Sequence, residues 1–168
     1  MEIILDKTND TPLVHFAPGL LVIEGRSITE DVFGFWTPLQ NWVESYTANP
    51  EATTSIEIGL EYTNSSSNKF ISQILRKITS IAEKGYKVEV TWKYEEDDES
   101  ILQLGKDMES LCEIPFKYIQ LDTVKQRSRK ITIRRKKNGE QFTISQRYWE
   151  AIMRNGHDQE YTVISEED

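Results

Sequence analysis

Apolar and polar residues follow one another along the chain with two different periods. In four stretches the apolar residues are contiguous or alternate with polar ones, which predicts strands: 20–23, 56–62, 88–94 and 116–121. In three stretches between them the apolar residues recur every three or four positions, which predicts helices: 39–46, 70–82 and 101–111. This alternation predicts an α/β fold in which helices pack on a sheet. The strand–helix–strand order over 56–94 also predicts a right-handed crossover between parallel strands.

Single residues predict where these helices begin, bend and turn their apolar faces. Thr29 precedes two acidic residues and predicts a helix start, because acidic groups favour the positive end of the helix dipole. Pro38 predicts a kink at Thr37–Pro38, after which the helix continues to about Thr47. In the third helical stretch the residues predicted to face inward are Ile101, Leu104, Met108 and Leu111.

The last part of the chain has a pattern of its own. Asn138-Gly139 between two apolar stretches predicts a β-hairpin with a two-residue turn, which places Ile133 opposite Ile144 and Lys137 opposite Glu140. Ser145 is predicted to cap a following helix that ends at Asn155-Gly156, and a final strand is predicted over 161–164. One face of the hairpin is predicted to be apolar, formed by Ile131, Ile133, Phe142 and Ile144.

Charge divides the chain in the same place. The net charge of −8 combines a body, 1–121, that carries 20 acidic and 10 basic side chains with a segment, 122–168, that carries 8 acidic and 10 basic ones. Eight of those ten basic residues lie between Lys125 and Lys137. We therefore predict two domains, 1–121 and a basic C-terminal extension over 122–168, joined by a linker at 122–130.

Composition excludes several classes of protein. One Cys among 168 residues cannot form a disulfide framework or a zinc site with two thiolates, and two His residues leave little for metal or triad chemistry. No apolar run approaches the ~20 residues of a membrane-spanning helix. His15 and Cys112 are interpreted as structural, and the acidic run 95–99 as a solvated loop that favours the next helix. We expect a soluble cytoplasmic protein without cofactor or metal.

Six consecutive polar residues, 63–68, stand between a predicted strand and the predicted helix 70–82. The first backbone N–H groups of a helix have no partner within the helix and favour an anion. A hydroxyl at this position can cap the helix, or carry a phosphoryl group of roughly −1.5 to −2 charges. The alternative is a plain capping loop, for which one Ser or Asn is enough.

Three groups of residues resemble the SiaC family of bacterial regulatory phosphoproteins over about 10–121. The first group is Glu24-Gly25-Arg26-Ser27, Glu30-Asp31, Phe35-Trp36-Thr37-Pro38 and Trp42. The second, Tyr62-Thr63-Asn64-Ser65-Ser66-Ser67-Asn68-Lys69, resembles the family's Y-x-N-[TS]-S-S-x-[KR] segment. The third follows in the family's order: Val90-Thr91-Trp92-Lys93-Tyr94, the acidic run, Gly105 and Pro115-Phe116.

The resemblance implies a STAS-like mixed β-sheet with packed helices. It also implies phosphorylation in the 63–67 loop by a dedicated serine/threonine kinase, reversal by a PP2C-type phosphatase, and binding of a diguanylate cyclase in c-di-GMP signalling. The family's phosphoacceptor, commonly Thr, falls on Ser65, with Ser66 and Ser67 as rivals. The partner-binding residues around it would be Tyr62, Asn64, Ser66 and Lys69.

Three functions remain to be compared. The leading hypothesis is a non-enzymatic phospho-switch protein whose bare surface around Ser65 docks a partner. The alternative is a nucleic-acid-binding adaptor that uses the basic segment 125–137, whose binding would fall steeply with salt. An enzyme with a Ser nucleophile would need a nearby base, and no His lies within the motif. We therefore expect no enzymatic activity and no membrane partner, and nucleic acid is the less favoured partner.

Overall fold

The computed structural model describes residues 2–121 and 130–167, without the side chains of Arg147 and Glu167. The chain forms two compact units, Met1–Gln120 and Leu121–Asp168. The predicted linker 122–130 lies outside the described residues except for Lys130.

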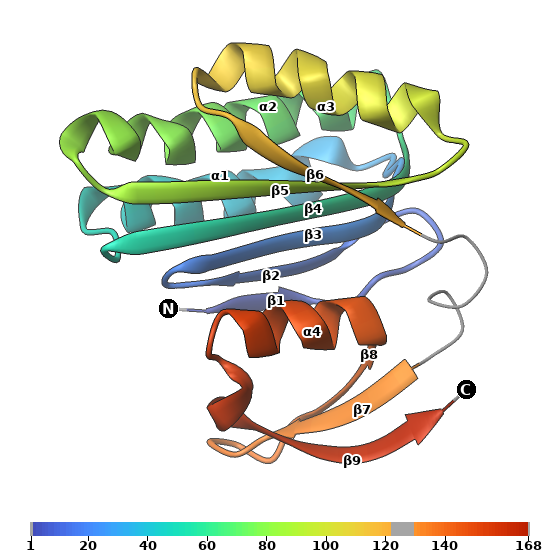
Figure 1. The fold of residues 1–168 in the computed structure, drawn as a ribbon. Helices are drawn as coiled ribbons and strands as arrows, with labels where there is room; N and C mark the ends of the chain where they lie inside the picture. The colour runs from blue at the N-terminus through green and yellow to red at the C-terminus, as the bar shows by residue number, and fades with distance from the viewer. Residues whose placement is uncertain (1, 122–129, 168) are drawn as a thin grey trace. The chain divides into compact units, whose positions relative to one another are not determined.

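A six-stranded mixed sheet forms the first unit, with strand order β1-β2-β3-β4-β5-β6 (Figure 1). β1–β2 and β2–β3 are antiparallel, whereas β3–β4 and β4–β5 are parallel. The parallel pairing of β4 and β5 confirms the predicted crossover between parallel strands over 56–94, and the predicted α/β class is also confirmed. The strands are β1 (Ile3–Leu5), β2 (Leu13–Ala17), β3 (Leu20–Ser27), β4 (Thr53–Thr63), β5 (Lys87–Glu95) and β6 (Phe116–Leu121).

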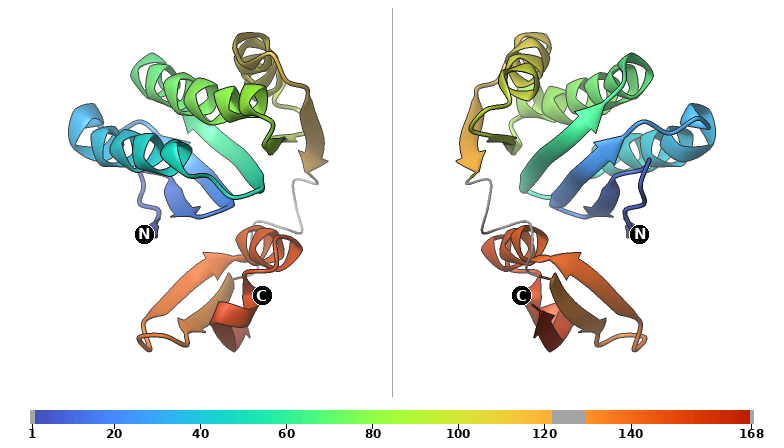
Figure 2. Two further views of the ribbon diagram at one scale, coloured as in Figure 1. Left: turned by 90° about the vertical axis from the view of Figure 1, so that its left-hand side faces the viewer. Right: turned by 90° about the vertical axis from the view of Figure 1, so that its right-hand side faces the viewer.

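Three α-helices pack on one face of this sheet (Figures 1 and 2). They are α1 (Val32–Ala48), α2 (Ser65–Thr79), which continues into a 3₁₀ turn at Ser80–Lys84, and α3 (Glu99–Cys112). Alternate residues of the central strands, such as Leu21, Ile23 and Ile58, form a buried core with helix residues such as Trp36 and Ile74. The burial of this apolar surface supplies the main driving force for folding of the unit.

The first helix differs from its prediction at two points. It begins after Asp31 rather than Thr29, since the Asp31 carboxylate accepts a hydrogen bond from the backbone N–H of Gly34 at 2.9 Å. Pro38 does not divide it: α1 runs without interruption through Pro38 to Ala48. Trp36 and Leu39 are fully buried on either side of the proline, so core packing offsets the backbone hydrogen bond that Pro38 cannot donate.

The third helix faces the core as predicted at Ile101, Leu104 and Met108 but not at its last predicted position. Leu111 is 52% exposed, so its predicted inward position was wrong. The residues that α3 buries are Ile101, Gly105, Met108 and Cys112. A Cβ atom on Gly105 would lie 2.7 Å from the Trp92 ring. The absence of a side chain at 105 therefore lets the helix approach the sheet there, with Cys112 rather than Leu111 facing inward.

The second unit, orange to red in Figure 1, has a three-stranded antiparallel sheet of order β8-β7-β9 and one α-helix. The predicted apolar face is confirmed, because Ile131, Ile133, Phe142 and Ile144 are all buried. Ser145 caps the helix as predicted, accepting from the N–H of Tyr148 at 3.2 Å. The elements are β7 (Lys130–Arg135), β8 (Gln141–Ser145), α4 (Gln146–Arg154), a 3₁₀ turn at Asp158–Glu160 and β9 (Tyr161–Glu167).

The register of the hairpin was predicted wrongly by two residues. Ile133 pairs with Phe142, and Ile131 pairs with Ile144. The backbone N–H of Arg135 donates to Glu140 O at 2.8 Å, so four residues rather than two form the turn. A shift of two residues leaves every side chain on the same face, so the apolar pattern could not detect it.

Candidate functional site

The polar run 63–68 joins the end of β4 to the start of α2. Asn64 has an extended backbone and caps the helix, because its Oδ1 accepts a hydrogen bond from the N–H of Ser67 at 2.8 Å. Its own N–H donates to Ser27 O at the end of β3 at 3.1 Å. The start of α2 is thus fixed both by its own cap and by the neighbouring strand.

The three serines of this loop differ in accessibility. Ser65 and Ser66 are exposed in the first turn of α2, whereas Ser67 is fully buried. The Ser67 hydroxyl has no hydrogen-bond partner among the described residues. A kinase could reach Ser65 or Ser66 on the folded protein, but Ser67 only after the first turn opened. Burial therefore disfavours Ser67 as a phosphoacceptor.

The residues predicted as neighbours of Ser65 differ in their position and exposure. Tyr62 is 58% exposed and precedes the loop at the end of β4. Lys69 is exposed and lies four residues after Ser65 on the same helix, a spacing that places the two side chains on one face. Thr63, which was not singled out, donates its hydroxyl to Asn68 Oδ1 at 2.7 Å and further orders the loop.

Two further residues at this site were not among the predicted site residues, although Arg26 belongs to the first group that resembles the family. The guanidinium carbon of Arg26, near the end of β3, lies 5.8 Å from the centroid of the Tyr62 ring. Phe33, in the first turn of α1, is 73% exposed and contacts Phe70 of α2 edge-on, with ring centroids 5.6 Å apart. We call Arg26, Phe33, Tyr62, Ser65 and Ser66 the α2-start surface. Neither Arg26 nor Phe33 is adjacent to the serines in sequence, so only their contacts identify them.

An acidic groove of about 740 Å³ adjoins this surface on the Tyr62 side. Its lining includes Tyr62, Thr63 and Asn68 from the serine loop. Its acidic residues are Glu61 at the end of β4 and Asp98, Glu99 and Asp107 at and after the start of α3. The predicted acidic run thus contributes to the groove, and Asp98 also caps α3 by accepting from the N–H of Ile101 at 2.9 Å.

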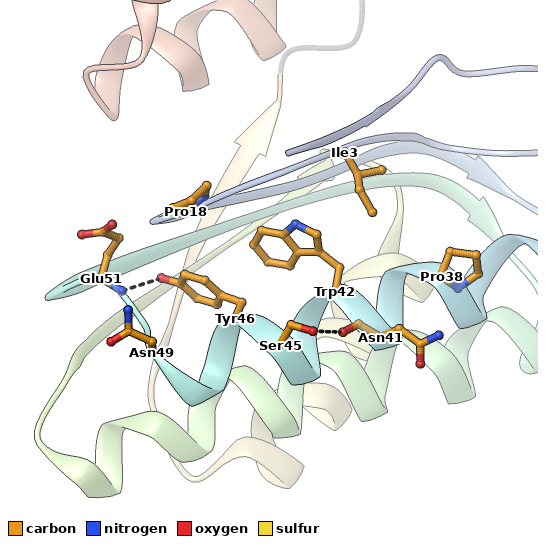
Figure 3. Close-up of a pocket in the computed structure, with 9 residues that line it drawn as sticks. All are labelled: Ile3, Pro18, Pro38, Asn41, Trp42, Ser45, Tyr46, Asn49 and Glu51. Carbon is orange, nitrogen blue, oxygen red and sulfur yellow. Dashed lines mark hydrogen bonds between the residues drawn. The ribbon is translucent and has the colours of Figure 1, made fainter. Parts of the chain in front are cut away.

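A second pocket, of about 620 Å³, is lined by the later turns of α1 together with Ile3, Pro18 and Glu51 (Figure 3). Trp42 and Tyr46 form its aromatic wall, with ring centroids 5.0 Å apart and nearly parallel planes. The Tyr46 hydroxyl already bonds Thr54 Oγ1 at 2.7 Å and accepts from the backbone N–H of Gly19 and Glu51 at 3.2 Å. The pocket contains none of the residues of the predicted site.

Part of the basic cluster serves the fold of the second unit. The guanidinium of Arg135 lies 5.2 Å from the ring centroid of Phe142 and 5.9 Å from that of Tyr161. The ammonium of Lys136 donates to Gln159 O at 2.8 Å. These two side chains are committed to contacts within the unit, which weakens the case for 125–137 as a nucleic-acid surface.

Other groups that could carry chemistry have structural partners. His15 is buried and its Nε2 lies 2.6 Å from the Glu2 carboxylate. Burial raises the pKa of the Cys112 thiol above its ordinary 9.0, so this thiol is a poor nucleophile. Within residues 2–121 and 130–167, no three His, Cys, Asp or Glu side chains are grouped to hold a metal ion. No helix in the same ranges is long and apolar enough to cross a membrane.

Comparison with known proteins identifies a matching family and a related chain. The family model described as SiaC family regulatory phosphoprotein matches residues 5–121. An uncharacterized protein of Pseudomonas aeruginosa strain UCBPP-PA14 is 26% identical over 111 residues, which are 65% of this chain and 88% of the relative.

Two solved structures from Pseudomonas aeruginosa share the fold. SiaC from a complex in which it is the activator of the diguanylate cyclase SiaD is 24% identical, with a TM-score of 0.66 over 71% of this chain and 99% of the other. Apo-SiaC is 24% identical, with a TM-score of 0.63 over 70% and 98%. Both matches cover nearly the whole of those chains, whereas this chain is longer.

Proposed function

The chain belongs to the SiaC family of regulatory phosphoproteins, and we propose that it is a partner-switching protein controlled by phosphorylation of Ser65. The observation that carries the proposal is the exposure of Ser65 at the start of α2, where Asn64 caps the helix beside exposed Tyr62. A dedicated serine/threonine kinase would add the phosphoryl group, and a PP2C-type phosphatase would remove it. The protein itself would act by binding and not by catalysis.

The α2-start surface is the proposed docking face of the bare protein. Phe33 and Tyr62 expose large aromatic side chains there, and such residues often contribute most of the binding energy of an interface. Asn64 and Lys69 would shape the edge of this face. By analogy with the complex of the Pseudomonas SiaC, we propose a diguanylate cyclase as the effector, and hence a role in c-di-GMP regulation.

Phosphorylation would oppose docking through charge and desolvation. At an exposed helix start, a dianion gains only about 0.3–1 kcal/mol from the dipole, so the fold changes little in stability. The same dianion enclosed in an interface without a cationic partner would cost several kcal/mol. Because each 1.4 kcal/mol changes affinity tenfold, the effect on binding would exceed the effect on folding.

The acceptor is tested by phosphorylation with the cognate kinase and mass spectrometry of the intact protein. Wild type should gain one phosphate, and Ser65→Ala should gain none while keeping its circular dichroism spectrum. Ser66→Ala is the matched control, because Ser66 is the other exposed serine of the same turn. Unchanged incorporation in Ser65→Ala, with loss in Ser66→Ala, would move the acceptor to Ser66.

The switch is tested by the affinity of the effector for Ser65→Asp and Ser65→Asn. The two side chains have nearly the same shape, so the difference between them reports charge alone. We expect Ser65→Asp to bind at least about tenfold more weakly than Ser65→Asn, with melting temperatures within a few degrees of wild type. Equal binding by the two variants would refute the charge mechanism, and tighter binding by Ser65→Asp would reverse its direction.

A further inference from the structure

Arg26 occupies an unusual position on the α2-start surface. It follows the point where the pairing of β3 with β4 shifts, and the shift brings Arg26 level with Tyr62. Its guanidinium stacks over the Tyr62 ring at 5.8 Å, and among the described residues no carboxylate forms an ion pair with it. Among the residues that the structure describes, this aromatic contact is the one restraint on the exposed side chain, and it is a weak one.

The backbone brings the end of β3, one residue after Arg26, into contact with the residue before the proposed acceptor. Ser27 O, in the next residue of β3, accepts the N–H of Asn64 at 3.1 Å, and Ser65 is the next residue after Asn64. The end of β3 and the start of α2 are thus in direct contact. An arginine side chain is long and flexible enough to reach across such a contact.

Lys69 approaches the same position from the helix. It lies four residues after Ser65, and side chains in a helix slant toward its N-terminus, so the ammonium extends back toward Ser65. Within the described part of the chain Lys69 also has no ion-pair partner from a carboxylate. Two exposed cationic side chains, from two different elements, therefore start from backbone positions close to one exposed serine.

We propose that Arg26 and Lys69 together bind the phosphoryl group on Ser65, and that Arg26 leaves the Tyr62 ring to do so. A guanidinium can donate two parallel hydrogen bonds to a phosphate, and this charge-assisted pair is stronger than an exposed cation–π contact. Lys69 adds a point charge on the helix side. The inference rests on the proposed phosphorylation of Ser65 and adds the residues that respond to it.

The exchange of partners by Arg26 would change the docking face itself. In the bare protein, Arg26 covers one face of Tyr62 and presents a cation beside it. After phosphorylation that cation would be neutralised and the Tyr62 ring uncovered. The effector would then meet a surface altered at two points, Ser65 and Tyr62, rather than at one.

The test uses the full chain with phosphoserine incorporated at position 65 during synthesis, so that no kinase is needed. The second pKa of the phosphate is measured by phosphorus NMR in wild type, Arg26→Gln and Lys69→Gln. Each substitution should raise this pKa by about 0.2–0.7 unit, the shift that an exposed ion pair produces. Arg76→Gln, at the other end of α2, is the matched control and should leave it unchanged.

The Tyr62 ring resonances give the second readout. Phosphoserine at 65 should shift them in the direction that Arg26→Gln shifts them in the bare chain, because both remove the guanidinium from the ring. An unchanged phosphate pKa in Arg26→Gln, or Tyr62 resonances that do not respond to phosphoserine, would overturn the role of Arg26. Failure of the effector to distinguish the two forms would refute the proposed function and leave these NMR results standing.

Discussion

Replacement of Asn64 by alanine tests how the start of α2 is held in place. The substitution removes the Oδ1 atom that accepts the N–H of Ser67 at 2.8 Å. Loss of an N-cap costs about 0.5–2 kcal/mol, and a buried donor without a partner costs about 1–3 kcal/mol. Because Ser67 is fully buried, water cannot replace the lost acceptor, and we expect the upper part of the first range, about 1.5–2 kcal/mol.

For a unit of this size such a loss corresponds to a melting temperature lower by about 5–8 °C. Thermal and urea denaturation followed by circular dichroism would measure it. Asn64→Asp keeps the acceptor and adds a charge that the helix dipole favours, so it should melt at or above the wild-type temperature. Ser65→Ala, an exposed change beside the cap, should stay within about 0.5 kcal/mol of wild type.

The reasoning would be refuted if Asn64→Ala melted within about 1 °C of wild type, since the cap would then contribute nothing measurable. It would also be refuted if Asn64→Asp fell as far as Asn64→Ala, because the side-chain acceptor would then not be the cause. If the melting temperatures follow the expected order, the cap that holds Ser65 in a fixed first turn also contributes to the stability of the unit.

Three further predictions concern the rest of the chain. Gly105→Ala should destabilise the protein in a thermal melt. The ~1 kcal/mol gained in helix propensity is outweighed by about 1–3 kcal/mol of overpacking against Trp92, because the Trp92 Nε1 atom is fixed to Ile101 O at 2.9 Å. A variant more stable than wild type would contradict this prediction. Residues 1–121 alone should give a cooperative melt and remain a substrate for the kinase. An unfolded or insoluble product would show that the first unit needs residues 122–168 in order to fold. Burial and, after it, the hydrogen bond to Glu109 at 2.8 Å raise the pKa of the Tyr118 hydroxyl well above its ordinary 10.0. The protonated hydroxyl therefore stabilises the folded protein fully below pH 10, and this stabilisation is lost as the pH rises above 10. Ultraviolet titration should show that Tyr118 ionises late, and at lower pH in Glu109→Gln than in wild type.

The sequence by itself determined the order and type of the strands and α-helices from β3 onward and the loop that carries the site, but it did not predict β1. Periodicity predicted the strand–helix–strand crossover of β4, α2 and β5, because a period of two and a period near four leave different apolar patterns along a chain. Local chemistry predicted the Ser145 cap, since the capping atoms lie within three residues of one another. The residues of the Tyr62–Lys69 segment predicted the family that the family model confirmed.

Only the tertiary structure decided which side chains meet. The hairpin was predicted two residues out of register because a period of two fixes the face of a strand and not its partner. Periodicity turned Leu111 inward, whereas in the structure Leu111 is exposed and Cys112 is buried on a helix that approaches Trp92 closely at Gly105. In both cases the deciding contact joins residues from different elements, which no local pattern describes.

The serine loop itself could be predicted from the sequence, whereas the exposure of its serines and the residues around it could not. Three serines of equal chemistry stand side by side in the sequence, and packing alone leaves Ser65 and Ser66 exposed and buries Ser67. Arg26 and Phe33 precede the loop by thirty residues or more, and they reach its neighbourhood because β3 pairs with β4 and α1 packs on α2. Helix starts and periodic faces follow from interactions between near neighbours in the chain, whereas the surface around Ser65 follows from the pairing of distant segments driven by burial of the common core.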